Sequence, residues 1–219
     1  GAFKSMETKT RYVGSAFCFN NKGEFKGFDC FRDNEYDLIA GAIGKQILKF
    51  IVDNDRQVER LIIHYYKPIS KDEIDPIQKV LKTLGLTIPV IIITINKTES
   101  NDYVAFDTSS DALMPLSGTI IEIAKLKYLL FNNAKYSTAG TAKNHPFPVK
   151  LNLFCTQEEY LKDIPVVKEL IDQVYQFSRM YWKSVKQQNL PVTIKYPEMV
   201  AQIFPHFEGD KLPDFGKNN

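Results

Sequence analysis

Three basic side chains near the C-terminal end of the chain have the spacing of one helix face. Arg179, Lys183 and Lys186 stand at i, i+4 and i+7 in the stretch FSRMYWKSVKQQNLPVTIKYPEMV, so a helix would present them side by side. Lys195 follows in the first turn of a second predicted helix, whose N-terminus offers backbone N–H groups and a favourable dipole to an anion. The arrangement suits a phosphate backbone, and a solvated basic helix face would show the same spacing.

Two helices with a break between them would position these cations. An apolar stripe of helical period predicts a long helix that begins after Asp163 as N-cap and ends near Gln188. The break falls at Asn189-Leu190-Pro191, because the residue before a proline avoids the α region. Thr193 is then expected to cap the second helix.

Composition limits the classes of protein that the chain can belong to. The 219 residues are 44% hydrophobic and 12% aromatic, enough for a substantial core. The formal net charge is only +2, so a nucleic-acid site has to come from local clustering of cations. The three cysteines have no zinc-ligand spacing, which favours a reduced, cytoplasmic protein. We find no signal peptide or membrane-spanning run, and the abrupt ends suggest a C-terminal fragment of a longer protein.

The other segments alternate between strand and helix patterns. An unbroken β-branched run at 90–95 predicts a strand covered on both faces. Asp75-Pro76 predicts the start of a helix, and Gly85 its C′ position. The remaining predicted elements are a hairpin at 11–20 and 24–32, a helix at 36–52, a strand at 61–66, a hairpin at 117–124 and 128–135, and a strand at 147–154. This order predicts one mixed α/β sheet flanked by helices.

Four short motifs, in this order, resemble the PIWI domain of Argonaute proteins. They are LIIHYY at 61–66, ITINK at 93–97, GTAK at 140–143, and LP at 190–191 leading to YPEMVA at 196–201. The resemblance covers nearly the whole chain and implies a single RNase H-like PIWI domain over residues 1–219. It is strongest to the short prokaryotic Argonautes, which consist of MID and PIWI domains.

The resemblance also indicates where metal ligands should stand in an active nuclease. Such an enzyme needs acidic side chains around two Mg²⁺ ions about 4 Å apart. The residue that matches the central aspartate is Lys67, and the first strand, Gly1-Ala2-Phe3-Lys4, carries no carboxylate. Glu35 and Glu198 match the remaining positions only loosely. Without the central aspartate we expect no metal and no cleavage, and a first-strand ligand upstream of Gly1 remains an alternative.

Other catalytic interpretations have less support in the sequence. The histidines His64, His145 and His206 have no metalloprotease or deaminase spacing. His64 lies in an apolar strand and is expected to be a core histidine. Trp182 is likewise expected in the core, and no nucleotide-binding glycine motif occurs.

The polar residues that the resemblance places along a guide strand are expected to contact its phosphates. This set consists of Asn96, Lys97, Thr141, Lys143, Arg179, Lys183, Lys186, Asn189 and Lys195. Asn96 and Lys97 also end a central strand, where α/β sheets present ligand sites. Phosphate contacts position a nucleic acid without reading its sequence, so guide–target base pairing would read it.

The resemblance therefore implies a nuclease-dead module that binds a guide, RNA or DNA, and its complementary target strand. It further implies contact with a MID domain, and activation of a separately encoded TIR or Sir2 effector in antiphage defence. The domain itself needs no cofactor, and the resemblance allows Mg²⁺ at the guide 5′-phosphate in the full-length protein. Two alternatives stay open, which are an active Mg²⁺-dependent endonuclease and a protein-interaction scaffold.

Overall fold

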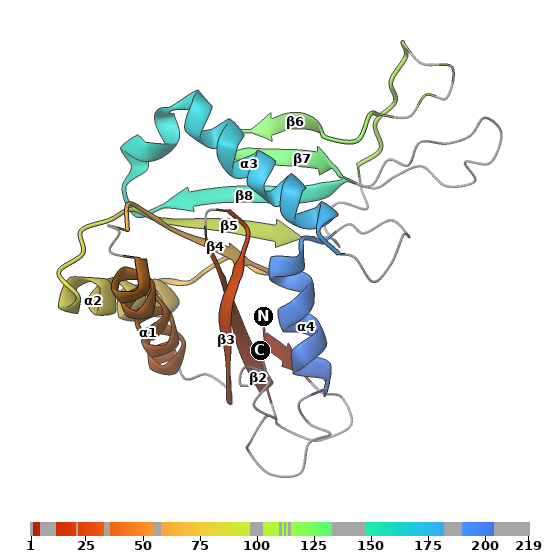
Figure 1. Cartoon of the computed structure of the whole chain (residues 1–219). Helices are drawn as coiled ribbons and strands as arrows, with labels where there is room; N and C mark the ends of the chain where they lie inside the picture. The colour runs from red at the N-terminus through yellow and green to blue at the C-terminus, as the bar shows by residue number, and fades with distance from the viewer. Residues whose placement is uncertain are drawn as a thin grey trace.

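The structure is a computed structural model of the chain, shown in Figure 1. It describes residues 2–4, 12–20, 22–32, 36–54, 58–96, 103–109, 111, 113, 115–132, 148–181 and 190–203. Within them, strands and helices alternate in the predicted order, with two sheets and four α-helices. No helix among these residues has the length and apolarity needed to cross a membrane.

The larger sheet has five strands, in the order β4-β5-β8-β7-β6. These strands are β4 (Leu61–Tyr65), β5 (Val90–Asn96), β8 (Val149–Cys155), β7 (Lys127–Phe131) and β6 (Thr119–Ala124). The β4–β5 pair is parallel, and the other pairs are antiparallel. In β5 only Asn96 has more than slight exposure, which confirms the prediction of a strand covered on both faces.

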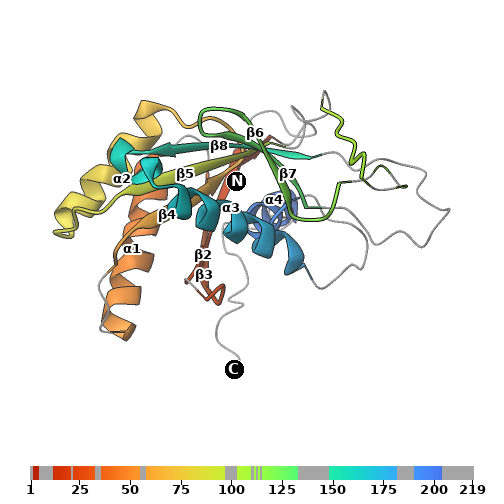
Figure 2. The same ribbon diagram turned by 90° about the horizontal axis from the view of Figure 1, so that it is seen from above.

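Different helices cover the two faces of this sheet. Alternate β5 residues, Ile91, Ile93 and Ile95, pack in a core with α3 (Ile164–Arg179). Val90 and Ile92 point the other way, into a core with α1 (Tyr36–Asn54) and α2 (Lys71–Thr83). In Figures 1 and 2, α1 and α2 accordingly lie together and apart from α3. A short 3-10 turn, η1 (Glu158–Lys162), leads from β8 to α3.

The smaller sheet contains β1 (Ala2–Lys4), β2 (Tyr12–Phe19) and β3 (Phe25–Arg32), all antiparallel. The β2–β3 hairpin was predicted, and its turn is held by the Asn20 side-chain oxygen. This oxygen accepts hydrogen bonds from the backbone N–H groups of Lys22 (3.0 Å) and Glu24 (2.9 Å). Gly23 takes a positive φ of 77°, which glycine adopts without strain.

The prediction of a single sheet is wrong for the described strands, because no strand pairing joins β1 to β4. Instead, α4 (Val192–Ile203) lies against β1, β2 and β4 and bridges the two sheets. The helices rather than the hydrogen-bond ladder therefore connect the two parts of the fold. The predicted α/β class, with a mixed sheet flanked by helices, is confirmed.

The start of α2 differs from the prediction, and its end agrees. The N-cap is Ser70 instead of Asp75, and Pro76 lies inside the helix. The earlier start is stabilised by Glu73, whose carboxylate accepts a hydrogen bond from the Ser70 backbone N–H at 2.9 Å. At the other end, Gly85 has φ 72° and donates to the Lys82 carbonyl at 3.0 Å, as a C′ glycine does.

Candidate nucleic-acid interface

The junction between α3 and α4 carries the described part of the predicted basic face. Asp163 is the N-cap of α3 as predicted, but the helix ends at Arg179 rather than near Gln188. The chain leaves the helix axis after Met180, and the Tyr181 ring packs on Tyr196 of α4 with 6.1 Å between ring centroids. This aromatic contact therefore lies directly beyond the end of α3.

The first turn of α4 is fixed by Pro191 instead of the predicted N-cap Thr193. The Pro191 carbonyl accepts hydrogen bonds from the backbone N–H groups of Ile194 (2.9 Å) and Lys195 (3.0 Å). Thr193 lies inside the helix, and its hydroxyl is 2.6 Å from Nδ1 of His64 in β4. The Thr193 side chain is therefore used for a contact between helix and strand, which explains why it does not cap.

His64 is a structural histidine, as the sequence predicted. Besides Thr193, it contacts Phe177 of α3, whose ring meets the imidazole edge-on with 5.8 Å between centroids. Burial lowers the pKa of His64 to about 4. The side chain is therefore neutral at physiological pH, and it connects β4 to α3 and α4.

Both described cations at the α3–α4 junction lie over tyrosine rings. The Lys195 Nζ is 3.8 Å from the centroid of the Tyr181 ring. The Arg179 guanidinium carbon is 5.9 Å from the centroid of the Tyr175 ring. The rest of the basic face, Lys183 and Lys186, lies outside the described residues, as does the predicted contact Asn189. The structure thus places Lys195 in the first turn of α4, as predicted, and Arg179 in the last turn of α3.

A second group of polar side chains lies at the carboxyl end of β5. Asn96 ends the strand and is directly opposite Lys150 of β8, so the two side chains share one face of the sheet. Two residues earlier, Thr94 is opposite Asn152 on the same face. Lys97, Thr141 and Lys143, which were predicted to join Asn96, lie outside the described residues.

Sequence reasoning missed Lys150 as a candidate phosphate contact. The signal was present, because Lys150 and Asn152 alternate with the apolar Val149, Leu151 and Leu153 in β8. This period of two indicates a strand with one polar face. Only strand pairing, however, shows that this face adjoins Asn96.

Lys67 follows β4 and forms an ion pair with Glu73 in the first turn of α2. Its Nζ is 3.0 Å from Oε1 of Glu73, whose side chain is only 5% exposed, whereas that of Lys67 is 40% exposed. The Tyr65 hydroxyl donates to the same oxygen at 2.5 Å, and the Ser70 hydroxyl donates to Oε2 at 3.0 Å. Together with the Ser70 backbone N–H, four donors therefore surround the carboxylate.

These contacts determine the charges of the cluster. Burial alone would raise the pKa of Glu73, but the hydrogen bonds from Tyr65, Ser70 and Lys67 lower the pKa overall. Burial likewise opposes the charge on Lys67, and the hydrogen bond to Glu73 together with its negative charge raises the pKa of the lysine. Both residues are consequently ionised at neutral pH.

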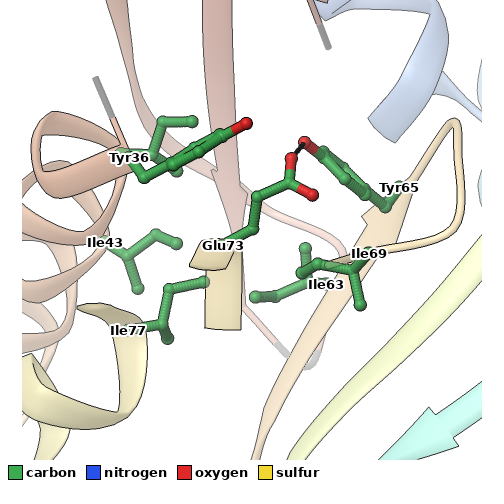
Figure 3. A pocket seen from close by; sticks show the side chains of 8 residues that line it. Tyr36, Ile43, Ile63, Tyr65, Ile69, Glu73 and Ile77 are labelled. Carbon is green, nitrogen blue, oxygen red and sulfur yellow. Dashed lines mark hydrogen bonds between the residues drawn. The ribbon is translucent and has the colours of Figure 1, made fainter. Parts of the chain in front are cut away.

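A small apolar cavity of about 30 Å³ adjoins this ion pair, between α1, α2 and β4. Figure 3 shows the Glu73 carboxylate directed toward the Tyr65 hydroxyl, with isoleucine side chains on both sides of Glu73. Its lining residues are Tyr36, Ile39, Ile43, Ile63, Tyr65, Ile69, Glu73 and Ile77. A cavity of this size and polarity has room for about one water molecule, not for a nucleotide.

The remaining predicted metal positions are Glu198 and Glu35. Glu198 lies in α4, where it is half-buried, and Glu35 lies outside the described residues. Within the part of the chain that the structure describes, no group of three or more His, Cys, Asp or Glu side chains could hold a metal ion.

Two known proteins are related to this chain in sequence. No family model matches it. A Piwi protein of Archaeoglobus fulgidus is 26% identical in an alignment of 178 positions that covers 75% of this chain and 41% of the relative. A protein argonaute of Cereibacter sphaeroides is 20% identical in an alignment of 234 positions, including gaps, that covers 97% of this chain and 29% of the relative.

Solved structures agree with these relatives. Argonaute from Aquifex aeolicus superposes with a TM-score of 0.63 at 15% identity, over 96% of this chain and 28% of that one. The chain is thus similar in sequence to Piwi and Argonaute proteins and in fold to Argonaute structures. Argonaute from Marinitoga piezophila, solved with a 5′ OH guide RNA, gives 0.60 at 16% identity over 86% of this PIWI-like chain and 29% of that chain. The chain spans less than half the length of the curated relatives it matches.

Proposed function

We propose that this domain binds a guide strand and its paired target and does not cut the target. Support for the binding comes from the two relatives named Piwi and argonaute. The similar fold of an Argonaute solved with a guide RNA supports it as well. The candidate phosphate contacts are Lys195, Arg179, Asn96 and Lys150, together with the predicted residues outside the described ranges.

The proposal that the domain does not cut the target is supported by the Lys67–Glu73 ion pair. Lys67 stands where the resemblance places the central metal-binding aspartate. With an effective dielectric constant of about 20, the electrostatic repulsion between an ammonium and a divalent cation about 4 Å apart is roughly 8 kcal/mol. Glu73 offsets part of that repulsion, but its carboxylate is already surrounded by donors. Neither residue is thus a suitable Mg²⁺ ligand.

The proposal extends to the partners that the resemblance implies. A MID domain would complete the pocket for the guide 5′ end, and target recognition would activate a separate TIR or Sir2 effector in antiphage defence in the cytoplasm. Consumption of NAD by a candidate effector, measured with and without a guide–target pair, tests this extension. Activation that does not depend on target complementarity would contradict it.

The binding itself is tested by its salt dependence in the full-length protein. Each lysine–phosphate contact with a single strand contributes about 0.7 to the slope of log affinity against log salt concentration. Charge reversal at Lys183 and Lys186 should therefore weaken guide binding and flatten this slope. The matched control is Lys125→Glu, since Lys125 is an exposed lysine in the turn between β6 and β7.

The control variant should bind the guide as the wild type does. Equal weakening by all three reversals would indicate an effect of net charge only. Unchanged affinity after reversal at Lys183 and Lys186 would contradict a role of the α3–α4 junction in guide binding and favour a protein-interaction scaffold.

A further inference from the structure

The edge strand β6 has the composition of a strand that lies inside a sheet. Among the described strands it pairs with β7 alone, and Figure 1 shows it at the outer edge of the five-stranded sheet. Its sequence contains three isoleucines and one charged side chain, Glu122. Edge strands commonly carry lysine or proline, which discourage pairing with another chain, and β6 contains neither. The sequence of β6 therefore does little to prevent the addition of another strand.

The isoleucines of β6 are exposed on both faces of the sheet. Ile120 is opposite Leu130 and Ile121 is opposite Leu129 in β7, so the two isoleucines point to opposite faces. Leu130 and Leu129 are 0% and 4% exposed, whereas Ile120 and Ile121 are 42% and 36% exposed. The core thus ends at β7. Beyond it, β6 leaves β-branched apolar side chains exposed that fit a strand with a neighbour on each side.

Another apolar side chain is held at the N-terminal end of this edge. Leu116 is 72% exposed, and its carbonyl accepts a hydrogen bond from the Thr119 backbone N–H at 3.0 Å. Between them, the Gly118 N–H donates to the Phe131 carbonyl of β7 at 2.7 Å. These two hydrogen bonds fix the backbone where the chain enters β6, so Leu116 is presented at a defined place beside the strand.

From this edge we propose that two copies of the protein associate by pairing their β6 strands antiparallel, which joins their five-stranded sheets. Each β6 then gains the second neighbour that its side chains fit, and the unpaired backbone groups of both edges form hydrogen bonds. Such a pair is symmetric and closed, because each copy uses its only β6 edge. The inference goes beyond the proposed function and does not depend on guide binding.

Charge selects the register of this pair. Identical antiparallel strands are related by a two-fold axis normal to the sheet, and the residue at the axis faces its own copy. The two central residues of β6 are Ile121 and Glu122. An axis at Glu122 would place two carboxylates opposite each other, which destabilises a strand pair. An axis at Ile121 places two apolar side chains together instead, in the part of β6 that precedes its register shift against β7.

The same register gives the exposed Leu116 an apolar neighbour. Leu116 lies five residues before Ile121, and Leu126 lies five residues after it. Leu126 is in the turn between β6 and β7, with φ 58°, and is only partly buried. In the antiparallel pair Leu116 of one copy arrives beside the Leu126 turn of the other, and symmetry repeats this contact at the opposite end. A second copy supplies both contacts, which is why we assign the edge to it.

Sedimentation of the full-length protein without nucleic acid, over a range of concentrations, tests the association. We expect a reversible equilibrium between monomer and dimer. Ile121→Lys should raise the dissociation constant of the dimer about tenfold or more, because it places two ammonium groups opposite each other and removes an apolar contact. The matched control is Val52→Lys in α1, where Val52 is 73% exposed and the helix lies away from β6 in Figures 1 and 2. This control should dimerise as the wild type does.

Cross-linking tests the register. Directly opposite residues of antiparallel strands have Cα atoms about 4.5–5.5 Å apart, within the range of about 4.4–6.8 Å that a disulfide spans. Mild oxidation of Ile121→Cys should therefore give a covalent dimer. Val52→Cys and the wild type, with its three natural cysteines, should give none.

Three results would overturn the proposal. The first is a wild type that remains monomeric at all concentrations, and the second is a dimer that Ile121→Lys and Val52→Lys weaken equally or not at all. The third is an Ile121→Cys variant that cross-links only to a different protein, which would assign the edge to that protein. If thermal melting shows that Ile121→Lys is unfolded, Ile121→Thr replaces it, since threonine keeps the β-branched shape and removes apolar surface.

Discussion

Acidification should destabilise this protein through His64 in a defined pH range. In the unfolded chain a histidine titrates near pH 6.5, whereas burial lowers the pKa of His64 to about 4 in the folded protein. Between these values the unfolded state binds more protons than the folded state. The free energy of unfolding must therefore fall as the pH falls from about 6.5 to about 4.

The size of the effect follows from the two pKa values. A difference of about 2.5 units corresponds to roughly 3 kcal/mol, reached in full only below pH 4. His64 retains some solvent exposure, so we take this value as an upper bound. Between pH 7 and pH 4.5 we expect a loss of about 2 kcal/mol attributable to this side chain.

Urea denaturation at a series of pH values measures this loss, with His64→Asn as the matched variant. Asparagine can still form a hydrogen bond with Thr193 but does not titrate. Because the carboxylates titrate in both proteins, the difference in free energy of unfolding between them isolates the histidine. That difference should shift by about 2 kcal/mol in favour of the variant as the pH falls. Parallel curves from pH 7 to pH 4.5 would refute the burial of a neutral His64.

Three further substitutions test the packing and capping, each measured by denaturant unfolding. Gly44→Ala should lower the free energy of unfolding by about 1–3 kcal/mol, because the new methyl group would overlap Cγ1 of Val80. Val80→Ala, added to this variant, should restore part of the lost stability. If it restores none, the strain does not arise from the contact with Val80. Gly85→Ala should cost about 1 kcal/mol from its positive φ alone, since no atom lies within 4 Å of the added carbon; a neutral result would contradict the left-handed backbone. Glu73→Gln should cost about 2 kcal/mol by removing the charge that four donors contact, and a stability equal to that of the wild type would argue against the ion pair with Lys67.

The parts of the fold that depend on local sequence could be predicted. The β-branched run of β5 indicates a buried strand because each of its side chains fits a pleated, covered surface. The turn at Gly23 and the C′ position of Gly85 could also be predicted, since few residues other than glycine accept a positive φ. In each case neighbouring residues alone determine the conformation.

The features that depend on distant contacts could not be predicted. Asp75-Pro76 has the form of a helix start, but the N-cap is Ser70. Glu73 stabilises this earlier start and also binds Tyr65 and Lys67 from the β4 side. At the end of α3, Tyr181 contacts Tyr196 of α4, a residue that is distant in the sequence. Such contacts compete with the local helix propensity of the residues, and no periodic pattern in the sequence indicates them.

In the candidate site, too, the features set by local sequence could be predicted and those set by distant contacts could not. The sequence pattern placed Lys67 and Lys195 correctly after β4 and in the first turn of α4. It gave no indication that one lysine is paired with a carboxylate and the other lies over a ring. It also did not identify Lys150, which adjoins Asn96 only through the pairing of β8 with β5.

The central claim, binding without cleavage, is tested most directly by scoring both on one sample. The full-length protein is loaded with a guide and mixed with a labelled complementary target in Mg²⁺, and parallel samples contain a chelator or a non-complementary target. Filter retention and a denaturing gel then report binding and cutting together. We predict retention of an intact complementary target, with or without Mg²⁺. Cleavage products that require Mg²⁺ and disappear with the chelator would contradict the claim.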